Sequence, residues 1–149
     1  MNVNTGIKRV AVIGPECTGK SELSEFLAAH FHTAWVPEYA RSYIENLPRP
    51  YEKHDLLSIA RGQLGLEDSL APKANRMLIC DTNLYVIKVW SMFKYGSIDP
   101  EILGELATRT YDLYLLTNVD IQWEADPQRE HPDKRDQLFE IYLNEMRKQ

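Results

Sequence analysis

The sequence predicts an α/β domain in which a doubly wound parallel sheet is covered by helices on both faces. The first observation is an alternation along the chain between short apolar runs rich in β-branched residues and longer stretches of helical spacing. The second is a length of 149 residues, which suits one domain. The third is a composition of 44% hydrophobic and 26% charged residues, which is typical of a folded chain.

The first strand and helix flank a glycine-rich turn. Residues 8–14 form a short apolar run that ends in glycine, and this predicts a buried parallel strand. Residues 21–31 then change to helical spacing. The face of this helix that we expect to be buried contains Leu23, Phe26, Leu27, His30 and Phe31.

The next three elements are a strand and two helices. Residues 33–36 predict a short strand, and residues 39–46 predict a helix that ends before Pro48. Residues 55–70 predict a longer helix, although glycines at 62 and 65 weaken its pattern. We expect its buried side to contain Leu56, Leu57, Ala60 and Leu64.

The same alternation continues with a third strand at residues 76–81, which is apolar until it ends in a carboxylate. Residues 82–94 and 99–108 have helical patterns, and Pro100 suits the first turn of the second helix. Residues 112–117 predict the fourth strand. Because ligands bind at the carboxyl ends of parallel strands, the site should lie where these strands end.

A polar connection and a further helix follow. Residues 118–134 contain two prolines and predict a loop, which we interpret as a lid because long polar connections in compact domains are usually functional. Arg129 or Arg135 would then stabilise negative charge on a bound ligand, or each would be a solvated surface residue. Residues 135–146 predict a helix with its inner face formed by Leu138, Ile141, Tyr142 and Met146.

The turn after the first strand matches G-x-x-x-x-G-K-[ST] without departure. Glycine lets the backbone approach a phosphate, and successive backbone N–H groups at a helix N-terminus form an anion-binding nest. Lys20 would reach the β- and γ-phosphates of a nucleotide, and the Ser21 hydroxyl would be a Mg²⁺ ligand. The residues expected to bind the nucleotide are Gly14, Pro15, Glu16, Cys17, Thr18, Gly19, Lys20 and Ser21.

Two further segments lie at predicted strand ends. Asp81 suits the second acidic group of a phosphate-loop protein, where it would orient Mg²⁺, take a proton from an acceptor hydroxyl, or cap the following helix. Across the cleft, Glu38 could accept from a sugar hydroxyl, Tyr39 could stack on a flat ring and Arg41 could bind an anion. The alternative is that Glu38 starts a helix, Tyr39 belongs to the core and Arg41 is solvated.

Four segments together resemble a known family. They are the phosphate loop with its preceding strand at residues 10–21, the Trp-Val-Pro-Glu-Tyr-Ala-Arg element at 35–41, Cys-Asp-Thr-Asn at 80–83, and Trp-x-x-Asp-x-x-Arg at 123–129. They resemble the nicotinamide riboside kinase domain of NadR-type NAD-salvage proteins, a P-loop kinase of the AAA-like ATP-binding type. The resemblance extends over most of the chain.

The resemblance implies a P-loop NTPase or kinase fold that uses ATP and Mg²⁺ to phosphorylate the ribose 5′-hydroxyl of nicotinamide riboside. It implies Lys20, Asp81 and Arg129 as catalytic residues, with Ser21 and Asp81 at the metal. The residues implied for substrate binding are Glu38, Tyr39, Arg41, Asn83, Trp123 and Asp126.

This chain departs from the family in three ways. Cys17 stands where the family usually has Ser or Thr, no nucleotidyltransferase domain or DNA-binding segment is visible, and the family continues into a final strand. That strand would follow Gln149, so we expect residues 1–149 to be a single kinase domain that lacks it.

Composition and charge exclude other functions. Seventeen basic against 22 acidic residues give a net charge of −5, which disfavours a nucleic-acid or membrane-surface binder. Two cysteines and the lack of a signal peptide or a long apolar run predict a reduced cytoplasmic protein. The resemblance implies that its partner is a small-molecule nucleoside. The alternatives are a kinase for another nucleoside or nucleotide, and an ATPase or ATP-binding switch that acts on a protein partner.

Overall fold

The computed structural model describes residues 6–119, 128–130 and 133–148. Within these residues a parallel sheet has the strand order β2-β3-β1-β4. Val12 pairs with Asp81 and Ile13 pairs with Leu116, so the carboxyl ends of the three longer strands meet at one edge. The strands are β1 (Lys8–Ile13), β2 (Trp35–Val36), β3 (Met77–Asp81) and β4 (Leu113–Leu116).

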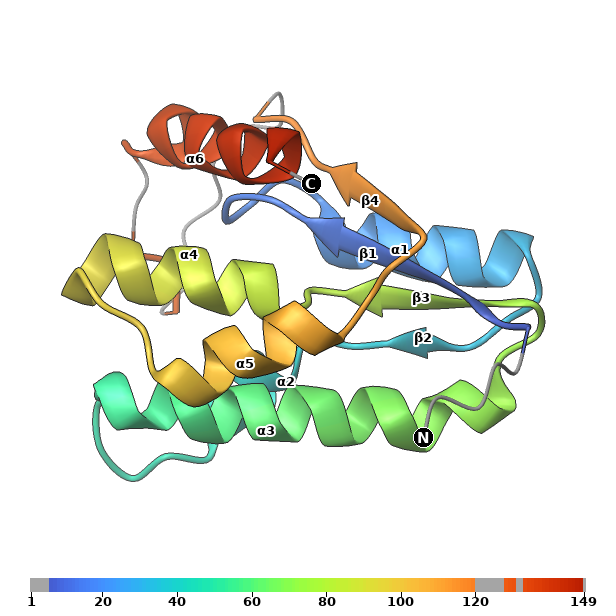
Figure 1. Ribbon diagram of the computed structural model, residues 1–149, viewed down its shortest axis with the longest axis horizontal. Coiled ribbons are helices and arrows are strands. Elements are labelled where there is room, and N and C mark those ends of the chain that lie inside the picture. The colour runs from blue at the N-terminus through green and yellow to red at the C-terminus, as the bar shows by residue number, and fades with distance from the viewer. Residues whose placement is uncertain (1–5, 120–127, 131–132, 149) are drawn as a thin grey trace.

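Helices cover both faces of the sheet, as predicted (Figure 1). On one face Val10 and Val12 of β1 pack against Ala28, and on the other Ala11 and Ile13 pack with Val89, Leu138 and Tyr142. None of the described helices is long and apolar enough to cross a bilayer. The helices are α1 (Lys20–His30), α2 (Tyr39–Glu45), α3 (Lys53–Leu70), α4 (Leu84–Tyr95), α5 (Pro100–Thr108) and α6 (Arg135–Arg147), with a short 3₁₀ turn at Ala71–Lys73.

The predicted inner face of α1 is partly wrong. Phe26 and Phe31 are 64% and 43% exposed, whereas Ser24 and Ala28 are buried against the sheet. The small side chain of Ala28 packs in one cluster with Val10 and Ile79 of the sheet. The start of α1 is also fixed by the phosphate loop, so the orientation of the helix follows the loop more than its largest apolar residues.

Helix α3 contains a glycine because an aromatic ring occupies the adjacent space. A Cβ atom on Gly62 would lie 2.1 Å from Cε1 of Tyr39, whereas a Cβ atom on Gly65 would meet nothing within 4 Å among the described residues. Gly62 therefore forms a notch in α3 that receives the Tyr39 ring from α2.

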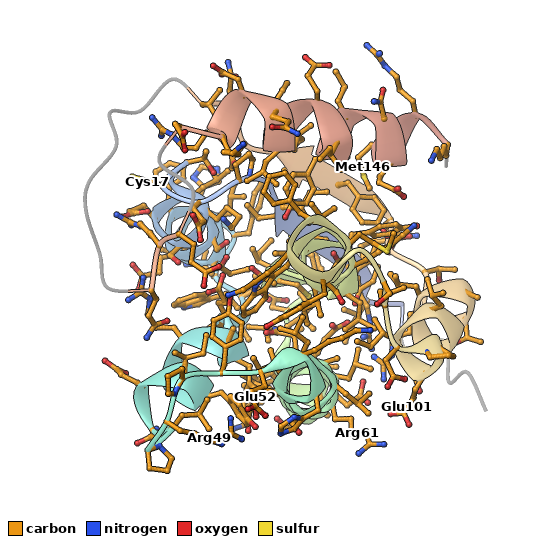
Figure 2. All side chains as sticks on the ribbon, turned by 90° about the vertical axis from the view of Figure 1, so that its left-hand side faces the viewer. Cys17, Arg49, Glu52, Arg61, Glu101 and Met146 are labelled. Carbon is orange, nitrogen blue, oxygen red and sulfur yellow. The ribbon has the colours of Figure 1, made fainter. Side chains whose placement is uncertain are left out.

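The N-terminus of α3 is organised around a buried carboxylate. Asp55 is 1% exposed and accepts hydrogen bonds from Arg49 Nη1 at 2.8 Å, from the Tyr43 hydroxyl at 2.8 Å and from the Glu52 backbone N–H at 2.7 Å. Figure 2 labels Arg49 and Glu52 beside this end of the helix. The Arg49 guanidinium is the main cause that holds the pKa of Asp55 well below its usual value, and the Glu52 and Tyr43 hydrogen bonds lower it further.

We expect Asp55→Asn to destabilise the fold at neutral pH and to lose this effect in acid. A carboxylate whose pKa is lowered by folding stabilises the fold above its unfolded pKa of 3.8, and that stability is lost as the pH falls toward the folded value. The stability gap between wild type and Asp55→Asn should be constant above about pH 5 and should close below about pH 4. Urea unfolding at a series of pH values measures it.

The matched control for this prediction is Asp99→Asn. Asp99 caps α5 by accepting from the Glu101 N–H at 2.9 Å, and Asn caps a helix about as well as Asp. A gap for Asp55→Asn that stays unchanged down to about pH 2 would show that the ionised carboxylate is not what stabilises this helix start.

Candidate active site

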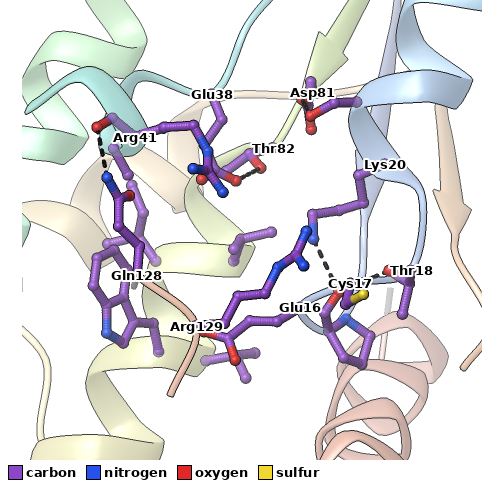
Figure 3. Close-up of a pocket in the computed structure, with 18 of the residues that line it drawn as sticks. Glu16, Cys17, Thr18, Lys20, Glu38, Arg41, Asp81, Thr82, Gln128 and Arg129 are labelled. Atoms are coloured by element: carbon purple, nitrogen blue, oxygen red, sulfur yellow. Dashed lines mark hydrogen bonds between the residues drawn. The ribbon is translucent and has the colours of Figure 1, made fainter. Parts of the chain in front are cut away.

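A cavity of about 510 Å³ opens at the carboxyl ends of β1, β2 and β3 (Figure 3). Its volume falls in the range of small-molecule sites. The structure brings together twelve of the residues predicted from sequence on its wall: Gly14, Pro15, Glu16, Cys17, Thr18, Gly19, Lys20, Ser21, Glu38, Arg41, Asp81 and Arg129.

The phosphate loop has the backbone shape that an anion-binding turn requires. Gly14 and Gly19 have φ values of +145° and +81°. A Cβ atom on Gly14 would lie 2.2 Å from Thr117 Oγ1, so a larger residue would push the loop away from β4. The N-cap residue of α1 is Gly19, which has no side chain to cap the helix, so the first N–H groups of α1 suit a phosphate.

The loop is also tied internally and to the end of β4. Pro15 O accepts from Thr18 Oγ1 at 2.7 Å and from Lys20 Nζ at 2.9 Å. The hydroxyls of Thr18 and Thr117 form a buried hydrogen bond of 2.5 Å. Thr117 was not singled out from sequence, because its partner is 99 residues away and the strand that ends beside it has an ordinary apolar pattern.

Asp81 is a buried residue that lines the cavity. Its Oδ2 accepts from the Ser21 hydroxyl at 2.6 Å, while its buried Oδ1 has no hydrogen-bond partner within the described part of the chain. Burial raises the pKa of Asp81 to about 6; the Ser21 hydrogen bond and Lys20 oppose this rise, and the carboxylates of Glu38 and Glu22 add to it. A carboxylate in this environment would be stabilised by a bound cation.

Glu38 lines the same cavity, and its carboxylate is held by a hydrogen bond from Thr82. The Thr82 hydroxyl donates to Glu38 Oε2 at 3.0 Å, and Figure 3 shows both side chains beside Asp81. Thr82 has a φ of +80°, which is rare for a β-branched residue. Sequence patterns do not reveal such a backbone angle, so Thr82 was missed as a site residue.

Two predicted substrate residues lie elsewhere. The Tyr39 ring packs into the notch at Gly62, and Asn83 is buried with its Oδ1 accepting from the Tyr85 N–H at 3.0 Å, where it caps α4. Neither is among the described residues that line the cavity. Tyr39 is partly buried and packs against the apolar cluster between α2 and α3, and Asn83 caps α4. Their predicted contacts with a substrate stay predictions. Trp123 and Asp126 lie outside the described residues.

The two arginines of the predicted lid region occupy different places. Arg129 lines the cavity and extends toward Lys20 in Figure 3. Arg135 is not among the described lining residues, and its Nη1 donates to Cys17 O at 2.9 Å. Neighbours of Arg129 attach this segment to the rest of the site: Gln128 Nε2 donates to Arg41 O at 3.2 Å, and the Glu130 N–H donates to Glu16 Oε2 at 3.1 Å.

A family model described as "AAA domain" matches residues 9–149 of the chain. The chain is 27% identical over 150 residues to the "Trifunctional NAD biosynthesis/regulator protein NadR" of Salmonella typhimurium, covering 96% of this chain and 36% of that protein. It is 27% identical over 126 residues to the protein of the same name from Escherichia coli, covering 80% and 30%. The chain thus spans about a third of the length of these relatives.

Two solved structures are similar in fold. A crystal structure of NadR protein in complex with NR superposes with a TM-score of 0.81 at 21% identity, covering 95% of this chain and 41% of that one. A NadR protein in complex with NAD and AMP-PNP gives a TM-score of 0.76 at 21% identity, with the same coverage. The likeness to NadR-type proteins that the motifs predict is confirmed.

Proposed function

The chain belongs to the AAA domain family, and from this premise we propose that it is an ATP- and Mg²⁺-dependent kinase that phosphorylates a nucleoside hydroxyl. The acceptor that we propose is the 5′-hydroxyl of nicotinamide riboside. The main supporting observation is a single cavity with the phosphate loop on one side and Glu38 and Arg41 on the other. The NR and AMP-PNP complexes of similar structures support the same pair of ligands.

The donor half of the cavity suits a nucleoside triphosphate. Backbone N–H groups of residues 14–21 would hold the phosphates, and Lys20 would move from Pro15 O to the β- and γ-phosphates. Ser21 and Asp81 fit a Mg²⁺ site, because the buried Oδ1 of Asp81 has no partner within the described residues. Mg²⁺ bound there with the phosphates would neutralise charge during transfer.

The acceptor half would be organised by Glu38. Its carboxylate is beside Asp81 and can accept the hydrogen bond of an acceptor hydroxyl, which orients the oxygen for in-line attack on the γ-phosphorus. The proton of that hydroxyl would pass to a carboxylate in the cavity as the new P–O bond forms and the bond to the ADP oxygen breaks. Positioning and charge stabilisation account for most of the catalysis in such transfers.

The different positions of the two arginines lead to different expected effects. Arg129→Ala should lower kcat by about 10²-fold or more and change the Kd for AMP-PNP only slightly, because Arg129 would stabilise charge that develops on the transferring group. Arg135→Ala should mainly weaken AMP-PNP binding, because it removes a donor to Cys17 O of the loop. Steady-state kinetics and calorimetry separate the two; an Arg135→Ala enzyme with the larger kcat defect would reverse this assignment.

The proposed function is tested by ADP release from Mg-ATP with a panel of nucleosides that includes nicotinamide riboside. We expect turnover that depends on nicotinamide riboside, with the phosphorylated product identified by mass spectrometry. Stimulation of ADP release by a different nucleoside would show that the protein is a kinase with another acceptor. ADP release that no nucleoside stimulates, with AMP-PNP binding intact, would favour an ATPase or switch instead.

A further inference from the structure

Glu38 lines the cavity, and its charge acts on the Asp81 carboxyl group, which raises the question of what holds it there. We propose that Gln63 and Thr82 are positioning residues that hold the Glu38 carboxylate in the acceptor half of the cavity. This inference rests on the proposed function, since it concerns the role of Glu38 in that reaction. Neither residue was predicted to belong to the site.

Gln63 holds the backbone on both sides of Glu38. Its Oε1 accepts from the Tyr39 N–H at 2.8 Å and its Nε2 donates to Pro37 O at 3.3 Å. The side chain comes from the middle of α3 and is 1% exposed, so these two bonds form out of water. A buried amide with both ends bonded to flanking peptide groups limits the rotation of the residue between them.

The bond to Tyr39 also explains why the Glu38 side chain is directed into the cavity. Glu38 is the N-cap residue of α2, yet its carboxylate accepts no capping hydrogen bond from that helix among the described residues. Gln63 supplies the cap by accepting from the first N–H of the helix. The Glu38 carboxylate is therefore not drawn back to its own helix.

The Tyr39 ring fixes the same segment from its other side. It occupies the notch at Gly62, the residue next to Gln63 in α3, where any Cβ atom would overlap the ring. Two adjacent residues of α3 thus hold the backbone and the side chain that follow Glu38.

Thr82 holds the carboxylate itself. Its hydroxyl, 44 residues away in sequence, donates to Glu38 Oε2 at 3.0 Å, and the residue is 2% exposed. Its backbone N–H donates to Val12 O at 2.9 Å, which anchors it to β1 at a φ of +80°. Strained conformations of this kind persist where the surrounding structure enforces them, and they cluster at functional sites.

The experiment is a double-mutant cycle with Glu38. Gln63→Met and Thr82→Val remove the hydrogen bonds at nearly constant volume, and each is made alone and in the Glu38→Ala background. Thr82→Ser keeps the hydroxyl. Thr33→Val is the matched control, because the Thr33 hydroxyl bonds to Met77 O and Thr33 is not among the described residues that line the cavity. The measurements are kcat and KM for nicotinamide riboside, and the Kd for AMP-PNP.

We expect Gln63→Met and Thr82→Val each to lower kcat/KM for nicotinamide riboside by about tenfold, with the Kd for AMP-PNP within about twofold of wild type. Thr82→Ser should recover most of the loss, and Thr33→Val should match wild type. In the Glu38→Ala background neither substitution should lower kcat/KM further, because there is no carboxylate left to position.

If each substitution lowers kcat/KM by the same factor with and without the Glu38 carboxylate, the proposal is overturned, since Gln63 and Thr82 would then act independently of Glu38. Equal weakening of AMP-PNP binding would also overturn it and indicate a general structural effect. If Gln63→Met does not fold, the comparison of Thr82→Val with Thr82→Ser tests the proposal by itself. A wild-type protein that phosphorylates no nucleoside refutes the proposed function before any variant is made, whereas an active wild type with additive variants refutes only the positioning roles.

Discussion

Lys20→Ala is expected to reduce turnover by about 10³-fold or more while the protein stays folded. In the structure Lys20 Nζ donates a hydrogen bond to Pro15 O, and Pro15 O keeps a second hydrogen bond from Thr18 when the lysine side chain is removed. The loop should therefore keep its shape and lose the positive charge that would move onto the β- and γ-phosphates.

Steady-state ADP release measures this effect, and circular dichroism with thermal unfolding checks the fold. Lys148→Ala is a suitable control, because Lys148 is 70% exposed at the end of the chain, next to Glu145, and is not among the described residues that line the cavity. A Lys20→Ala enzyme that is folded and fully active would contradict the proposal that phosphoryl transfer takes place at this loop.

Glu38→Ala should strongly lower phosphorylation of the acceptor and leave nucleotide binding intact. A positioned carboxylate that orients the hydroxyl and relieves it of its proton contributes about 10²- to 10⁴-fold in rate, so kcat/KM for the nucleoside should fall by that factor. The Kd for AMP-PNP should stay within a few-fold, because Glu38 is on the acceptor side of the cavity beside Thr82.

Nucleoside kinetics and AMP-PNP calorimetry on the same samples test this expectation, with Glu45→Ala as control. Glu45 is exposed at the opposite end of α2 and is not among the described lining residues. A Glu38→Ala protein that still phosphorylates the nucleoside, or one that changes only the binding of a protein partner, would favour the switch interpretation.

The parts of the site that follow from local rules were predictable from sequence. The phosphate loop is a contiguous motif with its own backbone requirements, and Asp81 ends an apolar strand whose register against β1 places it beside that loop. Glu38 and Arg129, which were also predicted from sequence, line the cavity. Asp81 and Glu38 lie at or just after the ends of β3 and β2, which a parallel sheet directs to one edge, whereas Arg129 comes from the connection between β4 and α6.

The residues that support the site were not predictable, because their roles depend on contacts between distant segments. Gln63 bonds to a residue 24 positions away, Thr82 to one 44 away and Thr18 to one 99 away. Sequence patterns place polar residues of a helix toward water, yet α3 buries Asp55, Gln63 and Glu67. The same limitation explains the error at α1, where Phe26 was expected inside and Ser24 is buried instead.

The notch at Gly62 has a consequence for how this sequence can change over evolutionary time. Any residue larger than glycine at position 62 would overlap the Tyr39 ring, and a smaller residue at position 39 would leave the notch empty. Single replacements at either position are therefore disfavoured, and acceptable changes arise as compensating pairs. Because position 39 directly follows Glu38, substitutions that change how α3 packs against Tyr39 would also move the acceptor site. We therefore expect positions 39 and 62 to covary among descendants of this chain.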